Sequence, residues 1–178
     1  MNKLIFTIIA ALSFTLFYSS CGDDKIEQDK PSIEGKWTVY DRILVSDKND
    51  EESVAFTNNV NNALNKNAKE DYRIEKTYIK RGETEEKGLV GDIRTEYTPL
   101  KIQFPIPTQT NEFELKGDSI VIYEGNLKNK GYCSVGEKIL IVKRKVGVEE
   151  LKPIMESVFM AIEIPDGYTA TYTTYEMR

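Results

Sequence analysis

The sequence contains no histidine among its 178 residues. This absence excludes the usual Ser-His-Asp and Cys-His forms of nucleophilic catalysis, and it removes the commonest zinc ligand. Phosphate-binding loops of the GxxxxGKS, GxxxxGKT or GxGxxG types are also missing. The acidic run at residues 83–86 lacks the spacing of an EF-hand and predicts a solvated loop. We therefore expect no catalytic residues, no metal and no cofactor, with a carboxylate-pair hydrolase as the least favoured alternative.

Cysteine is scarce, and positive charge is in the minority. The chain has only Cys21 and Cys133, and its 29 acidic and 24 basic residues give a net charge of −5. A chain with this balance and no basic patch is a poor match for a phosphate backbone, so nucleic acid is not an expected partner. Cys133 has no cationic neighbour in GYCSVG that would lower its pKa, which argues against a nucleophilic role.

An apolar run, LIFTIIAALSFTLFY, occupies residues 4–18 after the basic Lys3. About 15 residues with a rise of about 1.5 Å each cannot comfortably span a hydrocarbon core of about 30 Å. The run has the length of the apolar part of a secretory signal peptide, and Ser19 and Ser20 are the small residues expected before a cut. The chain is therefore predicted to be exported.

The segment FYSSC, residues 17–21, resembles a bacterial lipobox, in which the cysteine becomes the first mature residue. The resemblance implies that residues 1–20 are a lipoprotein signal peptide and that Cys21 is acylated, and two or more acyl chains anchor a protein stably. The alternative is an ordinary cleaved signal with an incidental Cys21. Asp23 and Asp24 resemble the acidic export tether of surface lipoproteins of the Bacteroidota. Together these likenesses imply a lipid-anchored protein of the outer membrane, with surface exposure left open.

The mature chain divides into a short tether and one domain. Residues 21–32 are polar, charged and contain a proline, which predicts a flexible tether. Residues 33–178 are long enough for a single domain with its own core. With Cys21 acylated, Cys133 would have no disulfide partner and is expected to be a lone, buried thiol.

Most of the domain predicts strands. The first is SIEGKWTVYDRILVS, in which alternating side chains separate two faces. The buried face, interrupted by Asp41, carries Trp37, Val39, Ile43 and Val45, and the other face carries Lys36, Thr38, Tyr40 and Arg42. A polar stretch with Gly82, Gly88 and Gly91 predicts a long hairpin loop. Further strands are predicted at residues 72–79, at 95–104, in a hairpin around Gly117 over 112–125, and in a hairpin around Gly136 over 130–146.

Two segments predict helices. Residues 53–66 carry one narrow apolar stripe, with Ser53 as the expected N-cap: Phe56, Val60, Ala63 and Leu64. Residues 148–159 predict a second helix, provided that Pro153 lies in its first turn. A competing interpretation makes residues 157–164 a strand that pairs, through the turn PDG, with residues 168–177. Both interpretations can hold if the helix is short and ends near Ser157.

Strands joined mainly by hairpins favour an antiparallel barrel or sandwich. Here SIEGKW resembles the Gly-x-Trp that opens lipocalins, at Gly35 and Trp37. Small lipocalin-like lipoproteins of the Bacteroidota combine this motif with a lipobox, a tether and a last strand rich in tyrosine and threonine. The resemblance implies a mainly β fold, a lipocalin-like barrel of about eight strands with one or two short helices, and an open β-sandwich is the alternative. The early helical segment at 53–66 departs from the family pattern, in which the main helix comes late.

Closure of a barrel pairs its first and last strands, because closure is what removes sheet edges. The neighbours of Trp37 should then come from the end of the last strand. The resemblance to lipocalins also implies a basic side chain packed across the indole at the closed end. Arg178 is the candidate by position and Arg144 the alternative, while the competing expectation is that Arg178 lies free in solvent as the terminal residue.

Two functions fit this architecture. The first is a non-catalytic binding module for a small apolar ligand in or at the mouth of the barrel, although a barrel of eight strands is also compatible with an interior filled by side chains. The second is an accessory or scaffold subunit of an envelope complex, acting through an outer face formed by Tyr168, Tyr172 and Tyr175. The alternative explanation is that these tyrosines are present because aromatic residues are common in strands.

The tripeptide DSI, at residues 118–120, resembles the acceptor for O-glycosylation in exported proteins of the Bacteroidota. The resemblance identifies Ser119 as a candidate glycosylation site, provided that it is accessible at the corner of its hairpin. The competing interpretation is a plain turn followed by the start of a strand.

Overall fold

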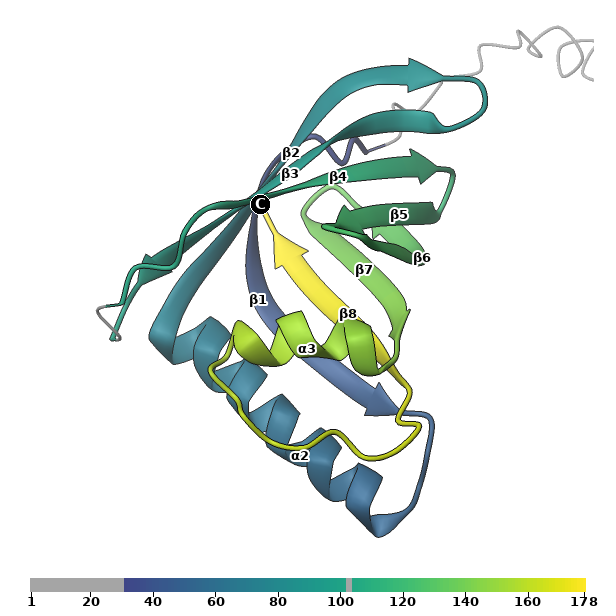
Figure 1. Ribbon diagram of the computed structural model, residues 1–178. Coiled ribbons are helices and arrows are strands. Elements are labelled where there is room, and N and C mark those ends of the chain that lie inside the picture. The colour runs from purple at the N-terminus through teal and green to yellow at the C-terminus, as the bar shows by residue number, and fades with distance from the viewer. Residues whose placement is uncertain (1–30, 102–103) are drawn as a thin grey trace, which may run out of the picture. The chain divides into compact units, whose positions relative to one another are not determined.

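The computed structural model describes residues 31–101 and 104–178. The predictions for the signal peptide, Cys21, Asp23, Asp24 and most of the tether lie outside these residues. The described strands form a closed barrel in the order β1 to β8, all paired antiparallel (Figure 1). The predicted lipocalin-like barrel is thus confirmed, and the alternative of an open sandwich is wrong.

The elements follow one another along the chain, with a short π-helix, η1, after the first helix: β1 (Gly35–Ser46), α2 (Glu51–Lys66), η1 (Asn67–Asp71), β2 (Tyr72–Thr84), β3 (Gly88–Pro99), β4 (Gln109–Lys116), β5 (Ser119–Glu124), β6 (Leu127–Val135), β7 (Ile139–Val146), α3 (Val148–Glu156) and β8 (Ala170–Met177). Neither α2 nor α3, the α-helices of the described chain, is long and apolar enough to cross a membrane.

The first and last strands close the barrel, as predicted. β1 pairs with β8 from Thr38 opposite Met177 to Ser46 opposite Ala170. On its other side β1 pairs with β2 only as far as Val39. Beyond that point α2 takes the place of a strand, because the side-chain amide of Asn61 bonds both backbone groups of Leu44, at 2.7 and 2.9 Å.

A β-bulge in β1 reverses which side chains face the interior. The register of β1 against β8 shifts between Val39 and Asp41, and an extra residue in one strand inverts the alternation that follows. Leu44 is therefore buried, whereas Val45 is 56% exposed. The prediction that Ile43 and Val45 share the buried face of Trp37 is wrong beyond the bulge.

The hairpin of β2 and β3 is longer than predicted, and its turn is tight. β2 continues to Thr84 and β3 begins at Gly88, so the expected long loop is wrong. Glycine is needed at Gly88, which has a φ of 73°. It is also needed at Gly91, where a Cβ would lie 2.2 Å from the carbonyl oxygen of Ile79. β3 ends at Pro99, short of the expected end, because proline has no N–H for the ladder.

Helix α2 begins earlier than predicted. Asp50 is its N-cap, since the Oδ1 atom accepts a hydrogen bond of 2.9 Å from the backbone N–H of Ser53. Ser53 is therefore a buried residue of the first turn, and its prediction as the cap is wrong. The predicted stripe does face the core through Phe56, Val60 and Leu64.

Helix α3 carries Pro153 inside the helix. Because α3 begins at Val148, the proline lies beyond the first turn, contrary to the prediction. It cannot donate a hydrogen bond to the carbonyl of the preceding turn. The competing strand at 157–164 does not form, and β8 pairs with β1 and β7 instead.

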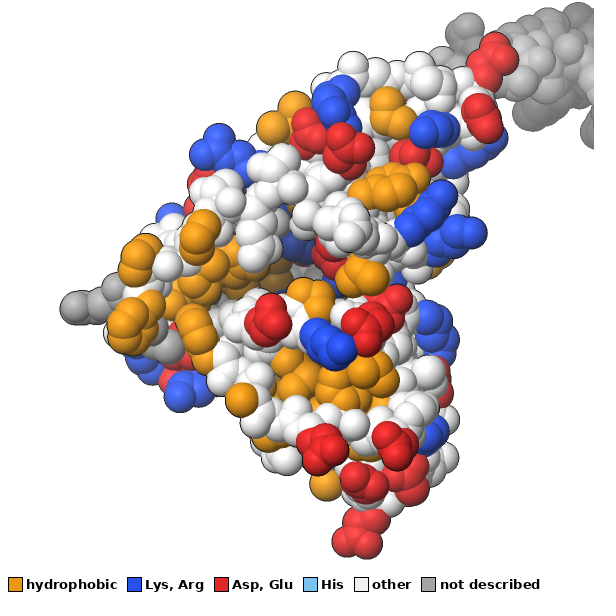
Figure 2. Space-filling view, viewed as in Figure 1, with side chains coloured by type: hydrophobic (Ala, Val, Ile, Leu, Met, Phe, Trp, Pro, Cys, Tyr) orange, Lys and Arg blue, Asp and Glu red, His pale blue; other side chains and the backbone are white. Residues whose placement is uncertain are grey.

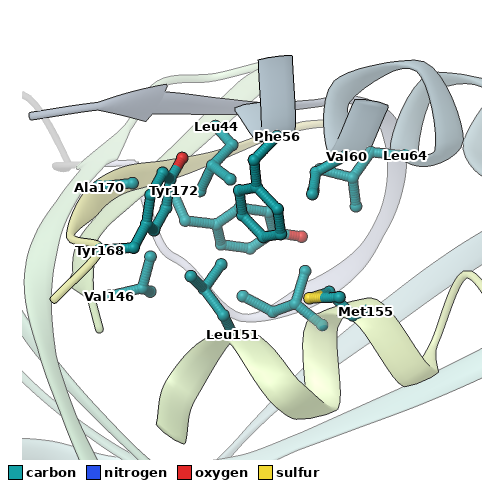
Figure 3. Packing of buried hydrophobic residues seen from close by; sticks show 11 residues of the cluster. Leu44, Phe56, Val60, Leu64, Val146, Leu151, Met155, Tyr168, Ala170 and Tyr172 are labelled. Atoms are coloured by element: carbon teal, nitrogen blue, oxygen red, sulfur yellow. The ribbon is translucent and has the colours of Figure 1, made fainter. Parts of the chain in front are cut away.

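Two of the three apolar clusters among the described residues lie at opposite ends of the barrel. The core at the closed end surrounds Trp37. The second lies between α2, α3 and the far ends of β1, β7 and β8 (Figure 3). In that core the rings of Phe56 and Tyr168 meet edge to face at 4.8 Å, and Tyr168 shares a hydrogen bond of 2.6 Å with Thr57. The interior of the barrel lies between these cores.

Candidate functional site

The closed end of the barrel is built around Trp37, which is wholly buried. Its Nε1–H donates a hydrogen bond of 2.8 Å to the carbonyl of Ile33. The guanidinium carbon of Arg178 lies 4.2 Å from the centroid of the indole, so Arg178 rather than Arg144 packs across it. Gly35 opens β1 with a φ of 114°, which favours glycine. The guanidinium of Arg178 also donates to three backbone carbonyls: those of Ser32, Glu34 and Glu137.

A cavity of about 580 Å³ occupies the barrel between the sheet and α3. In Figure 2 it is seen as a hollow with hydrophobic side chains on its walls, above the helix. The apolar lining includes five strand residues and one from α3: Val39, Ile74, Ile93, Ile122, Val142 and Ile154. Small-molecule sites have volumes of about 300–1,000 Å³. The interior therefore has room for a small ligand.

A buried ion pair borders the cavity on the side of the closed end. Glu176 has no exposed surface and accepts hydrogen bonds from Lys76 at 2.5 Å, Tyr78 at 3.1 Å and Thr174 at 3.0 Å. Burial, reinforced by the charge of Glu176, raises the pKa of Tyr78, so its hydroxyl stays protonated and donates. Lys76 and Thr174 also line the cavity. The carboxylate of Glu176 thus balances the charge of Lys76.

A second ion pair lies on the cavity wall. The Nη1 atom of Arg144 lies 2.8 Å from Oε2 of Glu124, which also accepts a hydrogen bond of 2.8 Å from Asn129. The guanidinium carbon of Arg144 is 5.5 Å from the centroid of the Tyr172 ring. Arg144 therefore lines the cavity. The alternative prediction, which placed Arg144 over the indole of Trp37, is wrong.

A third cation, Arg42, lines the cavity and has no carboxylate partner among the residues that the structure describes. It is 5% exposed, and its Nη2 atom donates to Oδ1 of Asn67 at 2.5 Å and to the carbonyl of Leu64 at 3.4 Å. Its Nε atom is buried and, within residues 31–101 and 104–178, has no hydrogen-bond partner. Alternation alone placed Arg42 on the outer face, and the bulge turns it inward. The polar Asp41 within an apolar face was the one feature of the sequence that indicated a bulge.

Cys133 is buried, as expected, and has no disulfide partner among the described residues. Burial, with a smaller contribution from Glu176, raises the pKa of its thiol to about 12. The thiol is therefore protonated at neutral pH, which does not suit a nucleophile.

Ser119 is exposed at the first position of β5, directly after the turn at Gly117, where φ is 58°. Its hydroxyl therefore meets the accessibility that glycosylation requires, and the modification itself stays a prediction. The proposed tyrosine face is wrong. Tyr168 and Tyr172 are buried, and Tyr175 lies against Tyr40 with ring centroids 6.0 Å apart.

Within residues 31–101 and 104–178, no group of three or more Cys, Asp or Glu side chains is placed so that it could hold a metal ion. Comparisons of the chain with models of protein families, with curated proteins and with solved structures found no match. Function is therefore inferred from the cavity and the residues that line it.

Proposed function

We propose that the protein is a lipocalin-like lipoprotein of the outer membrane, anchored by acyl chains on Cys21, whose barrel binds a small, largely apolar ligand without catalysing a reaction. The observation that carries this proposal is the cavity of about 580 Å³ with its apolar walls. It extends from the residues packed around Trp37 to helix α3.

The physical case rests on what an unfilled apolar cavity costs. Protein interiors are normally packed closely, and the walls of a void lose dispersion contacts. A ligand restores these contacts and removes apolar surface from water, which is worth roughly 25 cal/mol per Å². Isoleucine and valine side chains on several strands offer such surface here.

Adjacent residues of β5 provide a matched pair of variants. Ile122 is buried and lines the cavity, whereas Val121 is half-buried and lies on the outer surface. Ile122→Trp should fill part of the cavity, and Val121→Trp adds the same indole outside it. Circular dichroism would establish that both variants fold.

Titration with the neutral fluorescent probe N-phenylnaphthylamine would test the proposal. We expect saturable binding to the native chain and to Val121→Trp, and binding at least about tenfold weaker, a loss of about 1.4 kcal/mol, in Ile122→Trp. Absence of saturable binding to the native chain, or equal binding by the two folded variants, would overturn it.

A further inference from the structure

We propose that the ligand is a single-chain amphipathic anion, with its head group bound by Arg42 and its hydrocarbon chain against the apolar wall of the cavity. This inference rests on the proposed function and adds the chemical class of the ligand. It follows from the charges that line the cavity and from their partners.

Three cations line the cavity, and the ion pairs among the described residues balance two of them. Lys76 is paired with Glu176, and Arg144 with Glu124. Among the described residues, no carboxylate oxygen lies within 4.0 Å of the guanidinium of Arg42. Arg42 is therefore a buried charge without a counter-ion, which is costly unless an anion arrives.

The contacts that Arg42 does make compensate its charge only in part. Leu64 is in the last turn of α2, and the carbonyls at the end of a helix carry about half an elementary negative charge. Asn67 is neutral. A guanidinium has five N–H donors, whereas the described contacts use only Nη2, and the buried Nε has no partner. Donors thus remain for a carboxylate or phosphate oxygen.

The hydroxyl group of Tyr97 suits the same head group. Tyr97 lies on β3 and lines the cavity with Arg42. The register places Tyr97 opposite Ile74 on β2, and Ile74 opposite Val39 at the bulge of β1. Burial raises the pKa of Tyr97, against the opposing effect of the Arg42 charge, so its hydroxyl is a donor at neutral pH.

The remainder of the cavity suits a hydrocarbon chain. Ile93 and Ile122 lie on adjoining parts of the inner surface, and Ile154 contributes from α3. An amphipathic anion therefore satisfies both parts of the cavity. A cationic amphiphile would repel Arg42, and a neutral one would leave its charge without a counter-ion.

Displacement of bound N-phenylnaphthylamine from the full chain at pH 7 would test this inference, using four single-chain competitors: laurate, dodecyl phosphate, methyl laurate and dodecyltrimethylammonium. We expect laurate or dodecyl phosphate to bind at least about tenfold more tightly than methyl laurate, and the cationic amphiphile to bind most weakly. The anion that binds more tightly identifies the head group as a carboxylate or a phosphate. Equal binding of anionic and neutral competitors by the native chain would overturn the inference without any variant.

Arg42→Met removes the charge and keeps an unbranched apolar side chain. In this variant the preference for the anion over methyl laurate should disappear, while the affinity for methyl laurate stays within about twofold and confirms an intact cavity. Arg94→Met is the matched control, because the Arg94 side chain is 54% exposed and paired with Glu96 on the outer face. A preference that survives in Arg42→Met would overturn the assignment of the head group. Failure of the native chain to bind even methyl laurate and N-phenylnaphthylamine would instead overturn the proposed function itself.

Discussion

Replacement of the single tryptophan, Trp37→Ala, should be among the most destabilising changes in the domain. The indole is wholly buried, donates to the carbonyl of Ile33 and lies beneath the guanidinium of Arg178. Truncation of a buried tryptophan to alanine costs about 3–5 kcal/mol. The upper part of this range applies here, because a hydrogen bond worth about 1 kcal/mol and a cation–π contact worth about 0.5–2 kcal/mol are lost together.

Urea unfolding followed by far-ultraviolet circular dichroism measures this loss without relying on tryptophan fluorescence. A double-mutant cycle with Arg178→Ala should give a coupling of about 0.5–2 kcal/mol between the two side chains. Arg94→Ala, which removes an exposed arginine paired with Glu96, should change the free energy of unfolding by less than about 1 kcal/mol. A cost below about 1 kcal/mol for Trp37→Ala would contradict the close packing of Trp37 at the closed end of the barrel.

Three further predictions concern the anchor, the modification and the buried thiol. Cys21→Ser should abolish palmitate labelling and move the exported protein from the membrane to the soluble fraction, and unchanged partition into the detergent phase would contradict acylation. Native protein should be heavier by one glycan than the lipidated polypeptide, and Ser119→Ala should remove that difference in intact-mass spectrometry. Because the pKa of Cys133 is raised from 9.0 to about 12, its thiol ionises first in the unfolded chain, so the free energy of unfolding should fall from about pH 9 to about pH 12. In Cys133→Val, one proton fewer should be released on unfolding in this pH range, so the free energy of unfolding should fall less steeply with pH. An unchanged pH dependence would show that the thiol does not contribute.

The sequence alone predicted those elements in which the alternation of side chains and the turn residues indicate the same structure. The hairpins around Gly117 and Gly136 formed as expected, since alternating strands flank a short turn in both cases. The pairing of the first and last strands followed from the requirement that a closed barrel has no edges. Placement of Arg178 over Trp37 came from the resemblance to lipocalins together with that pairing.

The features that define the cavity could not be predicted from the alternation of the sequence. A bulge inverts every following side chain of β1, and only the register against β8 locates it between Val39 and Asp41. The prediction consequently placed Arg42 outside, although it is buried and lines the cavity. Whether a barrel is filled or hollow depends on the volumes of many side chains that meet from different strands, and periodicity carries no information about that sum.

Tertiary packing also overrode local sequence preferences in the hairpin of β2 and β3 and in helix α3. Glycine and polar residues around Gly88 predicted a loop, yet the close approach of Gly91 to Ile79 shows that these residues pair in strands. In α3, Pro153 is tolerated inside the helix because Ile154 and Met155 are buried against the second core. Such burial is not visible in propensity alone.

Solvent extraction of the purified native protein, followed by mass spectrometry, would show whether the barrel holds a ligand. We expect about one small amphipathic molecule per chain in the native protein and in Val121→Trp, and a marked loss of that molecule in Ile122→Trp. Extraction of no small molecule from the native protein, or of equal amounts from the two variants, would contradict a ligand-binding barrel.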